Sequence, residues 1–267
     1  MDLQLAGKRA LVTGSSSGIG ETIVEALARE KATVIVHGLL DEGVEHVTAR
    51  IRANGGTAHA CAADLRHDDE AGRLAAIAEQ RLGGVDILVN NLGVYTDTSW
   101  FAHGADDWLD IYNTNVLSAV RLIKLVVPAM RANGWGRVIQ ISSGEGARPL
   151  PFMPDYAASK GALNNLTMSL TRELAGTGVT VNTVSPGIFL TQNVRAFFRE
   201  RARTAGWGER WEDIEAAILR EVLPNAVGRL GAPEEVAHLV AFLASPLSGY
   251  IAGANLRIDG GSTPTVN

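Results

Sequence analysis

The sequence is poor in cysteine: among its 267 residues only Cys61 carries a thiol, so no internal disulfide can form. Structural disulfides belong to oxidising compartments, and their absence fits a reducing one. Residues 1–9 contain an early acid and no apolar run of the length found in signal peptides. We therefore expect a cytoplasmic protein.

Long hydrophobic runs and basic clusters are also missing from the sequence. No stretch approaches the roughly 18 uninterrupted apolar residues of a membrane span. The formal net charge is −5 and no run is rich in lysine or arginine, which argues against nucleic-acid binding. Hydrophobic residues make up 46% of the chain, enough at this length to fold without a disulfide or a metal. The sequence thus predicts a globular protein with no membrane, nucleic-acid or metal partner.

What is present is an alternation of short strand-like runs with longer helical patterns. Such alternation predicts right-handed βαβ units. We therefore expect an α/β protein with a single-domain Rossmann fold over residues 1–267, a doubly wound parallel sheet of about seven strands with helices on both faces. A ligand should bind beyond the carboxyl ends of the strands. The expected strands are 9–13, 33–37, 57–63, 85–90, 136–142, 179–185 and 255–258. The expected helices are 19–30, 41–53, 68–82, 105–132, 156–174 and 233–244.

One long segment, residues 189–225, interrupts this alternation and is predicted to be a lid over the substrate. Two short helices are expected in it, at 193–204 and 211–223, with a hinge at Gly206 and Gly208. Its aromatic side chains are expected to cover the substrate or to pack on a neighbouring subunit. Its arginines alternate with acids, which is typical of a solvated helix face; the alternative is that one arginine captures an anionic substrate.

A glycine-rich turn follows the first expected strand. Gly14, Gly18 and Gly20 lie where the chain turns into a helix, and the spacing differs from the common G-x-G-x-x-G by a longer first gap. A helix N-terminus offers free N–H groups and a partial positive charge to a pyrophosphate. The turn therefore predicts a dinucleotide site.

Tyr156 and Lys160 are four residues apart, so on a helix they share one face. A lysine charge roughly 5 Å away, at an effective dielectric of about 20, favours the phenolate by about 3 kcal/mol, which lowers the tyrosine pKa by about 2. The pair is therefore expected to act as an acid–base group near neutral pH. Ser143, at the end of a strand, and Asn115, inside the long helix, add polar groups near the predicted ligand site.

With these ordered motifs, from Gly7 to Gly261, the sequence resembles the short-chain dehydrogenase/reductase family in its shorter form, and in particular members like the 3-oxoacyl-acyl-carrier-protein reductases. The resemblance implies a catalytic tetrad of Asn115, Ser143, Tyr156 and Lys160. In the mechanism that it implies, the tyrosine exchanges a proton with the substrate oxygen and the serine hydrogen-bonds that oxygen. The lysine binds the nicotinamide ribose and keeps the tyrosine pKa low, and the asparagine holds a water that links the lysine to solvent.

The resemblance also implies which residues contact the cofactor. Asp64 matches the acid that binds the adenine amino group, and Asn90 opens an Asn-Asn-Leu-Gly sequence in which Leu92 replaces the usual alanine. Asp259 opens the Asp-Gly-Gly sequence usual near the C-terminus. The expected cofactor contacts are Gly14, Ser16, Ser17, Gly18, Ile19, Gly20, His37, Gly38, Leu39, Asp64, Leu65, Asn91, Gly93, Tyr156, Lys160, Pro186, Gly187, Ile188 and Thr191.

The sequence favours NADP over NAD and leaves use of both open. An acid near Gly38 would bind the ribose 2′-hydroxyl and select NAD, and a basic residue near Leu39 or Ser17 would select NADP. The chain has neither. The serines of the glycine turn and His37 are available as donors to a 2′-phosphate, and nothing acidic repels it.

The function predicted from these motifs is NAD(P)-dependent hydride transfer between a nicotinamide and a ketone or secondary alcohol, as in a carbonyl reductase or an alcohol dehydrogenase. A 3-oxoacyl thioester reductase is one candidate, and sugar, steroid, cyclic-ketone and small alcohol substrates stay open. The alternative class is a non-catalytic dinucleotide-binding sensor on the same fold; a lyase or a dehalogenase is a further possibility. Family members usually pair their long helices, so we expect a homotetramer.

Overall fold

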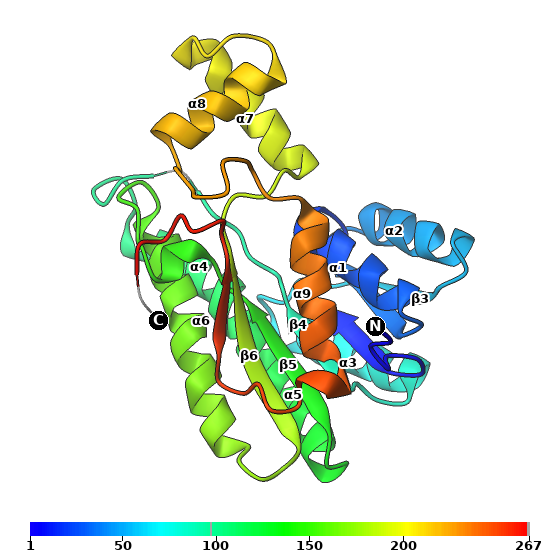
Figure 1. Cartoon of the computed structure of the whole chain (residues 1–267). Helices are drawn as coiled ribbons and strands as arrows, with labels where there is room; N and C mark the ends of the chain where they lie inside the picture. The colour runs from blue at the N-terminus through cyan, green and yellow to red at the C-terminus, as the bar shows by residue number, and fades with distance from the viewer. Residues whose placement is uncertain (97, 266–267) are drawn as a thin grey trace.

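The computed structural model describes residues 1–96 and 98–265 and has a seven-stranded, wholly parallel sheet in the order β3-β2-β1-β4-β5-β6-β7. This confirms the predicted doubly wound Rossmann fold (Figure 1). The strands are β1 (Arg9–Val12), β2 (Thr33–Gly38), β3 (Thr57–Ala62), β4 (Ile87–Asn90), β5 (Gly136–Ile141), β6 (Val179–Pro186) and β7 (Asn255–Ile258). The helices are α1 (Gly18–Arg29), α2 (Asp41–Ala53), α3 (Asp68–Leu82), α4 (Ala105–Tyr112), α5 (Ser118–Ala132), α6 (Pro154–Glu173), α7 (Gln192–Ala205), α8 (Trp211–Glu221) and α9 (Pro233–Ala244).

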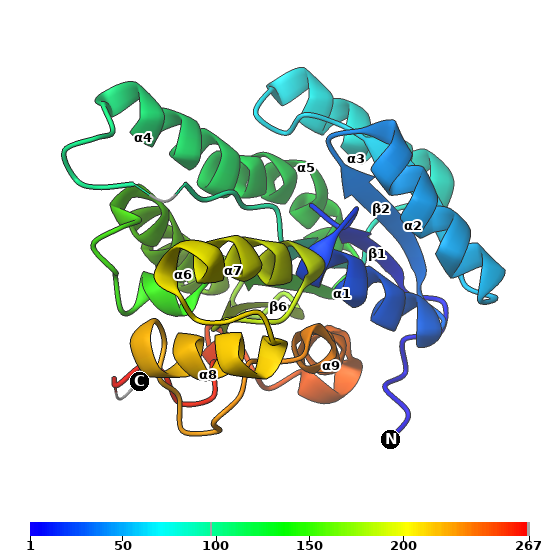
Figure 2. The ribbon, with the colours of Figure 1, turned by 90° about the horizontal axis from the view of Figure 1, so that it is seen from above.

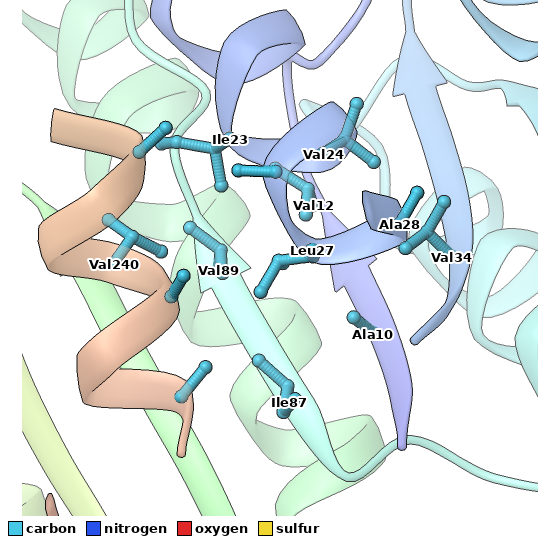
Figure 3. Close-up of a cluster of buried hydrophobic side chains, with 14 of the residues drawn as sticks. Ala10, Val12, Ile23, Val24, Leu27, Ala28, Val34, Ile87, Val89 and Val240 are labelled. Atoms are coloured by element: carbon cyan, nitrogen blue, oxygen red, sulfur yellow. The ribbon is translucent and has the colours of Figure 1, made fainter. Parts of the chain in front are cut away.

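The strands are apolar on both faces because helices cover both faces of the sheet. Ile87 and Val89 of β4 pack with α1, α2 and α9 in one core, whereas Leu88 packs with α3 and α5 in the other. Figure 3 shows the first core, where Leu27 of α1 and Val240 of α9 lie against β1 and β4. The alternation along each strand therefore assigns every side chain to one of two layers.

The order of the strands reverses at β1, which lies between β2 and β4. Helices following strands on the two sides of this point leave the sheet in opposite directions, so a crevice opens beyond the carboxyl ends of the strands. The view from above shows one end of α7 close to α1 and β1 (Figure 2). The glycine turn, the end of β5 and the end of β6 all meet at this crevice.

The expected single helix over 105–132 is instead two α-helices joined by a π-helical turn, Asn113–Leu117. The cause is a tertiary contact. The side chain of Asn115 bonds to the backbone of Val94, accepting from its N–H at 2.8 Å and donating to its carbonyl at 2.9 Å. Such bulges concentrate at functional sites, because they re-aim a side chain without ending the helix.

The two short helices predicted within 189–225 are confirmed as α7 and α8, which project above the sheet as a helical hairpin (Figure 1). The structure does not support a hinge between them. Gly206 ends α7 in the left-handed conformation, and Phe198 stacks on Trp207 across the turn at 6.5 Å. Phe198, Ile214 and Ile218 form a separate small core, so the hairpin is one packed unit. No helix of the described residues is long and apolar enough to cross a membrane.

Candidate active site

The glycine turn between β1 and α1 adopts a conformation that side chains would prevent. Gly14 and Gly18 have φ of +60° and +61°, which is the left-handed region that favours glycine. A Cβ on Gly20 would lie 2.2 Å from the carbonyl oxygen of Gly14. No side chain caps the N-terminus of α1, at Ser17, so its first amides are left for a ligand. The turn therefore leaves a helix N-terminus whose N–H groups are free to bind an anion.

Asn91 supports this turn from the end of β4. Its Nδ2 donates to the carbonyl oxygens of Thr13 and Gly14, both at 2.9 Å. The hydroxyl of Thr13 accepts in return from the N–H groups of Asn91 and Leu92, both at 3.0 Å. Asn91 still lines the cavity, but its amide holds the turn in shape. Thr13, which the sequence analysis missed, belongs to the same set of hydrogen bonds.

His37, predicted as a donor to the cofactor phosphate, points into the protein and does not line the cavity. Its ring is 1% exposed and both nitrogens are used: Nδ1 accepts from the N–H of Gly14 at 3.1 Å, and Nε2 lies 3.0 Å from the carbonyl oxygen of Ala63. Burial lowers the pKa of His37 to about 4, so the ring is neutral at physiological pH. It is a fixed link between the glycine turn and β3.

The end of β2 shows why an acid is absent there. A Cβ on Gly38 would lie 2.5 Å from the hydroxyl oxygen of Ser16, so the serine occupies the space that a side chain would need. Leu39, the next residue, is 62% exposed and lines the cavity. The ribose-binding end of the cavity is therefore uncharged, with the hydroxyls of Ser16 and Ser17 as its polar groups.

Asp64, expected at the adenine, is held by Arg66. The guanidinium donates to both carboxylate oxygens at 2.6–3.1 Å, and this pairing lowers the pKa of Asp64 to about 2. The Leu65 side chain is 1% exposed and belongs to the core, so only its backbone is available for a contact. Neither residue lies among those that line the cavity.

The other end of the cavity is formed after β6. A Cβ on Gly187 would lie 3.0 Å from the Cα of Asp259, so this glycine allows β6 to continue beside the Asp-Gly-Gly sequence. The Thr191 hydroxyl accepts from the N–H of Val194 at 3.2 Å and so caps α7. Thr191, predicted as a cofactor contact, therefore also begins the helical hairpin.

The predicted tetrad converges at the centre of this arrangement. Asn115 donates to the hydroxyl of Ser159 at 3.0 Å, and that hydroxyl donates to the carbonyl oxygen of Tyr156 at 2.7 Å. Nζ of Lys160 donates to the carbonyl oxygen of Ile141 at 2.9 Å. Ser159, one residue before the lysine, joins the asparagine to the catalytic helix and was missed by the sequence analysis.

The electrostatics of Tyr156 differ from the expectation. Burial raises its pKa to about 12, against a lowering effect of the hydrogen bond with Ser143, and Glu145 and Tyr95 raise it further. Burial also lowers the pKa of Lys160 to about 8. The lysine charge was expected to lower this pKa, but the desolvation of the phenolate is the largest effect. Tyr156 is therefore protonated at neutral pH.

A cavity of about 540 Å³ joins the two ends. It lies between the carboxyl edge of the sheet and the hairpin, and it also contains Glu145, Arg148, Tyr95 and Phe197. The predicted residues that it brings together are Gly14, Ser16, Ser17, Gly18, Ile19, Gly20, Gly38, Leu39, Asn91, Gly93, Ser143, Tyr156, Lys160, Pro186, Gly187, Ile188 and Thr191.

Comparisons with known proteins identify the family of this chain. The family model described as short chain dehydrogenase matches residues 8–202. The 3-oxoacyl-[acyl-carrier-protein] reductase of Vibrio cholerae is 36% identical, covering 97% of this chain and 98% of the relative. The structure of L-sorbose reductase from Gluconobacter frateurii with NADPH and L-sorbose has a TM-score of 0.94 and 30% identity, with complete coverage of both chains. A 7α-hydroxysteroid dehydrogenase complexed with NADH has a TM-score of 0.87 and 32% identity, covering 100% of this chain and 98% of that one.

A family match over more than half of the chain, a relative of nearly equal length and a shared fold at 30% identity or more all point the same way. The chain belongs to the short-chain dehydrogenase family, and it is an oxidoreductase.

Proposed function

We propose that this protein reduces a ketone to a secondary alcohol, and catalyses the reverse oxidation, with a nicotinamide dinucleotide as the hydride carrier. One observation carries the proposal: a single cavity joins the uncapped glycine turn to Ser143, Tyr156 and Lys160. The non-catalytic alternative has no comparable support, because each reactive side chain of the tetrad is present. In this proposal residues 1–267 form one domain and residues 189–225 form its lid.

The bound cofactor supplies the hydride, and the chain supplies position and a proton. Ser143 accepts a bond from the N–H of Glu145 at 3.2 Å, which leaves its own proton to donate to the substrate oxygen. Tyr156, protonated at neutral pH, gives its proton to that oxygen as the carbonyl is reduced. Lys160 lies beside Gly93, where the ribose is proposed to bind. Asn115 holds the neighbouring segment through its two bonds to the backbone of Val94. A water held by Asn115 stays a prediction.

NADP is the preferred cofactor in this proposal. The support is the uncharged end of β2, where Ser16 fills the space beside Gly38 and leaves no room for a selecting carboxylate. The hydroxyls of Ser16 and Ser17 would donate to the 2′-phosphate. Related structures contain NADPH or NADH, so both cofactors should be compared.

The substrate is a small molecule, and the related enzymes suggest candidates from 3-oxoacyl thioesters to sugars. The active protein is proposed to be a cytoplasmic homotetramer. The first test is a screen of ketones and alcohols with each cofactor, following the absorbance of the reduced nicotinamide.

Tyr156→Phe tests the assignment directly. The substitution keeps the ring and its packing on Tyr95, whose centroid lies 5.8 Å away, but removes the proton. We expect binding of the dinucleotide to persist, measured by fluorescence titration, while kcat falls by a factor of about 10²–10⁴. A variant that keeps a tenth of the wild-type kcat would refute the assignment.

A further inference from the structure

Glu145 occupies the cavity wall beside the proposed reaction centre without a charged partner. It lies in a short 3-10 turn, Gly144–Gly146, directly after Ser143. Its Oε2 accepts from the N–H of Leu150 at 2.9 Å, which fixes the carboxyl group in place. Among the described residues, no ion pair within 4.0 Å involves this carboxylate, and the bond to Leu150 uses only one of its oxygens. The group is therefore held in position with acceptor capacity to spare.

The surroundings of Glu145 are costly for a charge. Burial raises the pKa of Glu145, and the bond from Leu150 and the charge of Arg148 offset that only in part. The carboxylate also acts on the reaction centre, because it raises the pKa of Tyr156. The same cavity is also lined by the apolar side chains of Phe152 and Phe197. A half-buried carboxylate in such a place is stabilised when a donor pairs with it.

We propose that Glu145 selects substrates that carry a hydroxyl group on the carbon next to the carbonyl, as in hydroxyketones and keto sugars. This inference rests on the proposed function. Ser143 and Tyr156 would bind the carbonyl oxygen. Glu145 follows Ser143 by two residues and lines the same cavity, so the hydroxyl that it binds is proposed to stand on the neighbouring carbon. A hydroxyl there donates to the free oxygen of the carboxylate.

The donor should be neutral rather than cationic. Arg148 lies in the same cavity wall, its charge lowers the pKa of Glu145, and its guanidinium donates to the carbonyl oxygen of Ser262 at 2.9 Å. The two opposite charges leave this part of the cavity close to neutral overall. An ammonium group would gain from Glu145 and lose to Arg148, whereas a hydroxyl takes the bond without a net charge.

Three small ketones of nearly equal size separate the possibilities. Hydroxyacetone carries the hydroxyl, 2-butanone carries a methyl group in its place, and aminoacetone carries an ammonium. With the wild-type protein and its better cofactor, we expect kcat/KM for hydroxyacetone to exceed that for 2-butanone at least tenfold, which is the size expected of one charge-assisted hydrogen bond. Aminoacetone should not exceed hydroxyacetone.

The ratio of kcat/KM between hydroxyacetone and 2-butanone is the readout for variants, because it cancels effects common to both. Glu145→Gln keeps an acceptor for Leu150 but removes the charge, and it should lower the ratio about threefold or more. Glu145→Leu should bring the ratio near one. Glu45→Gln, an exposed position on α2, is the matched control and should leave the ratio as in the wild type.

Each outcome either supports or overturns the inference. A wild-type ratio near one, a preference for aminoacetone, or an unchanged ratio in Glu145→Leu would each overturn it. These results require turnover of at least one ketone, so they are distinct from failure of the proposed function, in which no ketone or alcohol reacts with either cofactor.

Discussion

His37 shows how a single buried side chain can tie stability to pH. The unfolded histidine has a pKa near 6.5, whereas the folded one, buried between Gly14 and Ala63, has a pKa of about 4. Between these values the unfolded chain binds more protons than the folded chain. The contribution of the neutral His37 ring to the free energy of unfolding is therefore fully present above about pH 6.5, and it is lost as the pH falls toward 4.

The resulting prediction concerns the free energy of unfolding. Between pH 7 and pH 4.5 the wild type should lose about 2–3 kcal/mol through His37, and His37→Asn should lack that loss. Urea denaturation at the two pH values measures it. His46→Asn, on the exposed face of α2, is the control and should follow the wild type. Parallel pH dependence in wild type and His37→Asn would contradict the prediction.

Leu39 offers a test of cofactor choice at a single exposed residue. Leu39→Arg would place a guanidinium where Leu39 lines the cavity, near the proposed 2′-phosphate. We expect the ratio of kcat/KM for NADPH over NADH to rise about tenfold through one charge-assisted bond. Leu40→Arg adds the same charge one residue further on, at a side chain that is 71% exposed and outside the cavity lining. Equal effects of both variants would mean that the residues at the end of β2 do not select between NADPH and NADH.

At the scale of elements, the sequence predicted most of the fold. The bounds of α2, α3 and α9 agree with the expected ranges, because each helix has an amphipathic pattern and clear ends. The π-helical turn at Asn113–Leu117 was missed, since it follows from the bonds of Asn115 to Val94, which no local pattern encodes.

The site was predicted less completely than the fold, for the same reason. The glycine turn and the spacing of Tyr156 and Lys160 are local, and the structure brings them together. The direction of a side chain and the balance of burial against charge are not local. His37 shares a strand face with buried Ile35, so the alternation along β2 was a signal that its ring points inward. The raised pKa of Tyr156 had no such signal.

The helical hairpin of α7 and α8 should move as one unit. Its own core joins Phe198, Ile214 and Ile218, so motion belongs to its connections, residues 187–191 and 222–230. Phe197 and Val194 of α7 line the cavity, so a bound substrate adds apolar contacts that favour closure. We therefore expect the hairpin to act as a lid whose hinges are these connections rather than Gly206 and Gly208.

Hydrogen exchange tests this motion. In the empty protein, amides of α7 and α8 should exchange faster than those of β5 and β6, and they should slow together when cofactor and substrate bind. Amides of α9, which packs in the sheet core, serve as the internal reference. If the hairpin amides are already as protected as the central strands without ligand, the segment is fixed architecture.

For the whole molecule, the distribution of apolar side chains argues for assembly. Leu109 of α4, Leu117 of the π-helical turn and Leu125 of α5 are 66%, 43% and 46% exposed. A shallow hollow beside them is lined by Val116, Ile123 and other residues of α5 and α6. These faces are proposed to pair in the homotetramer.

Light scattering at micromolar concentration should therefore give four chain masses. Leu125→Glu places a charge on this face without disturbing the core, because the side chain is 46% exposed in the single chain. We expect the variant to keep its helical circular dichroism and to dissociate to dimers or monomers, since a buried unpaired carboxylate opposes the interface. Leu40→Glu, on the opposite flank of the sheet, should stay tetrameric. A monomeric wild type would remove the proposal, because the exposed leucines at 109, 117 and 125 would then meet only solvent.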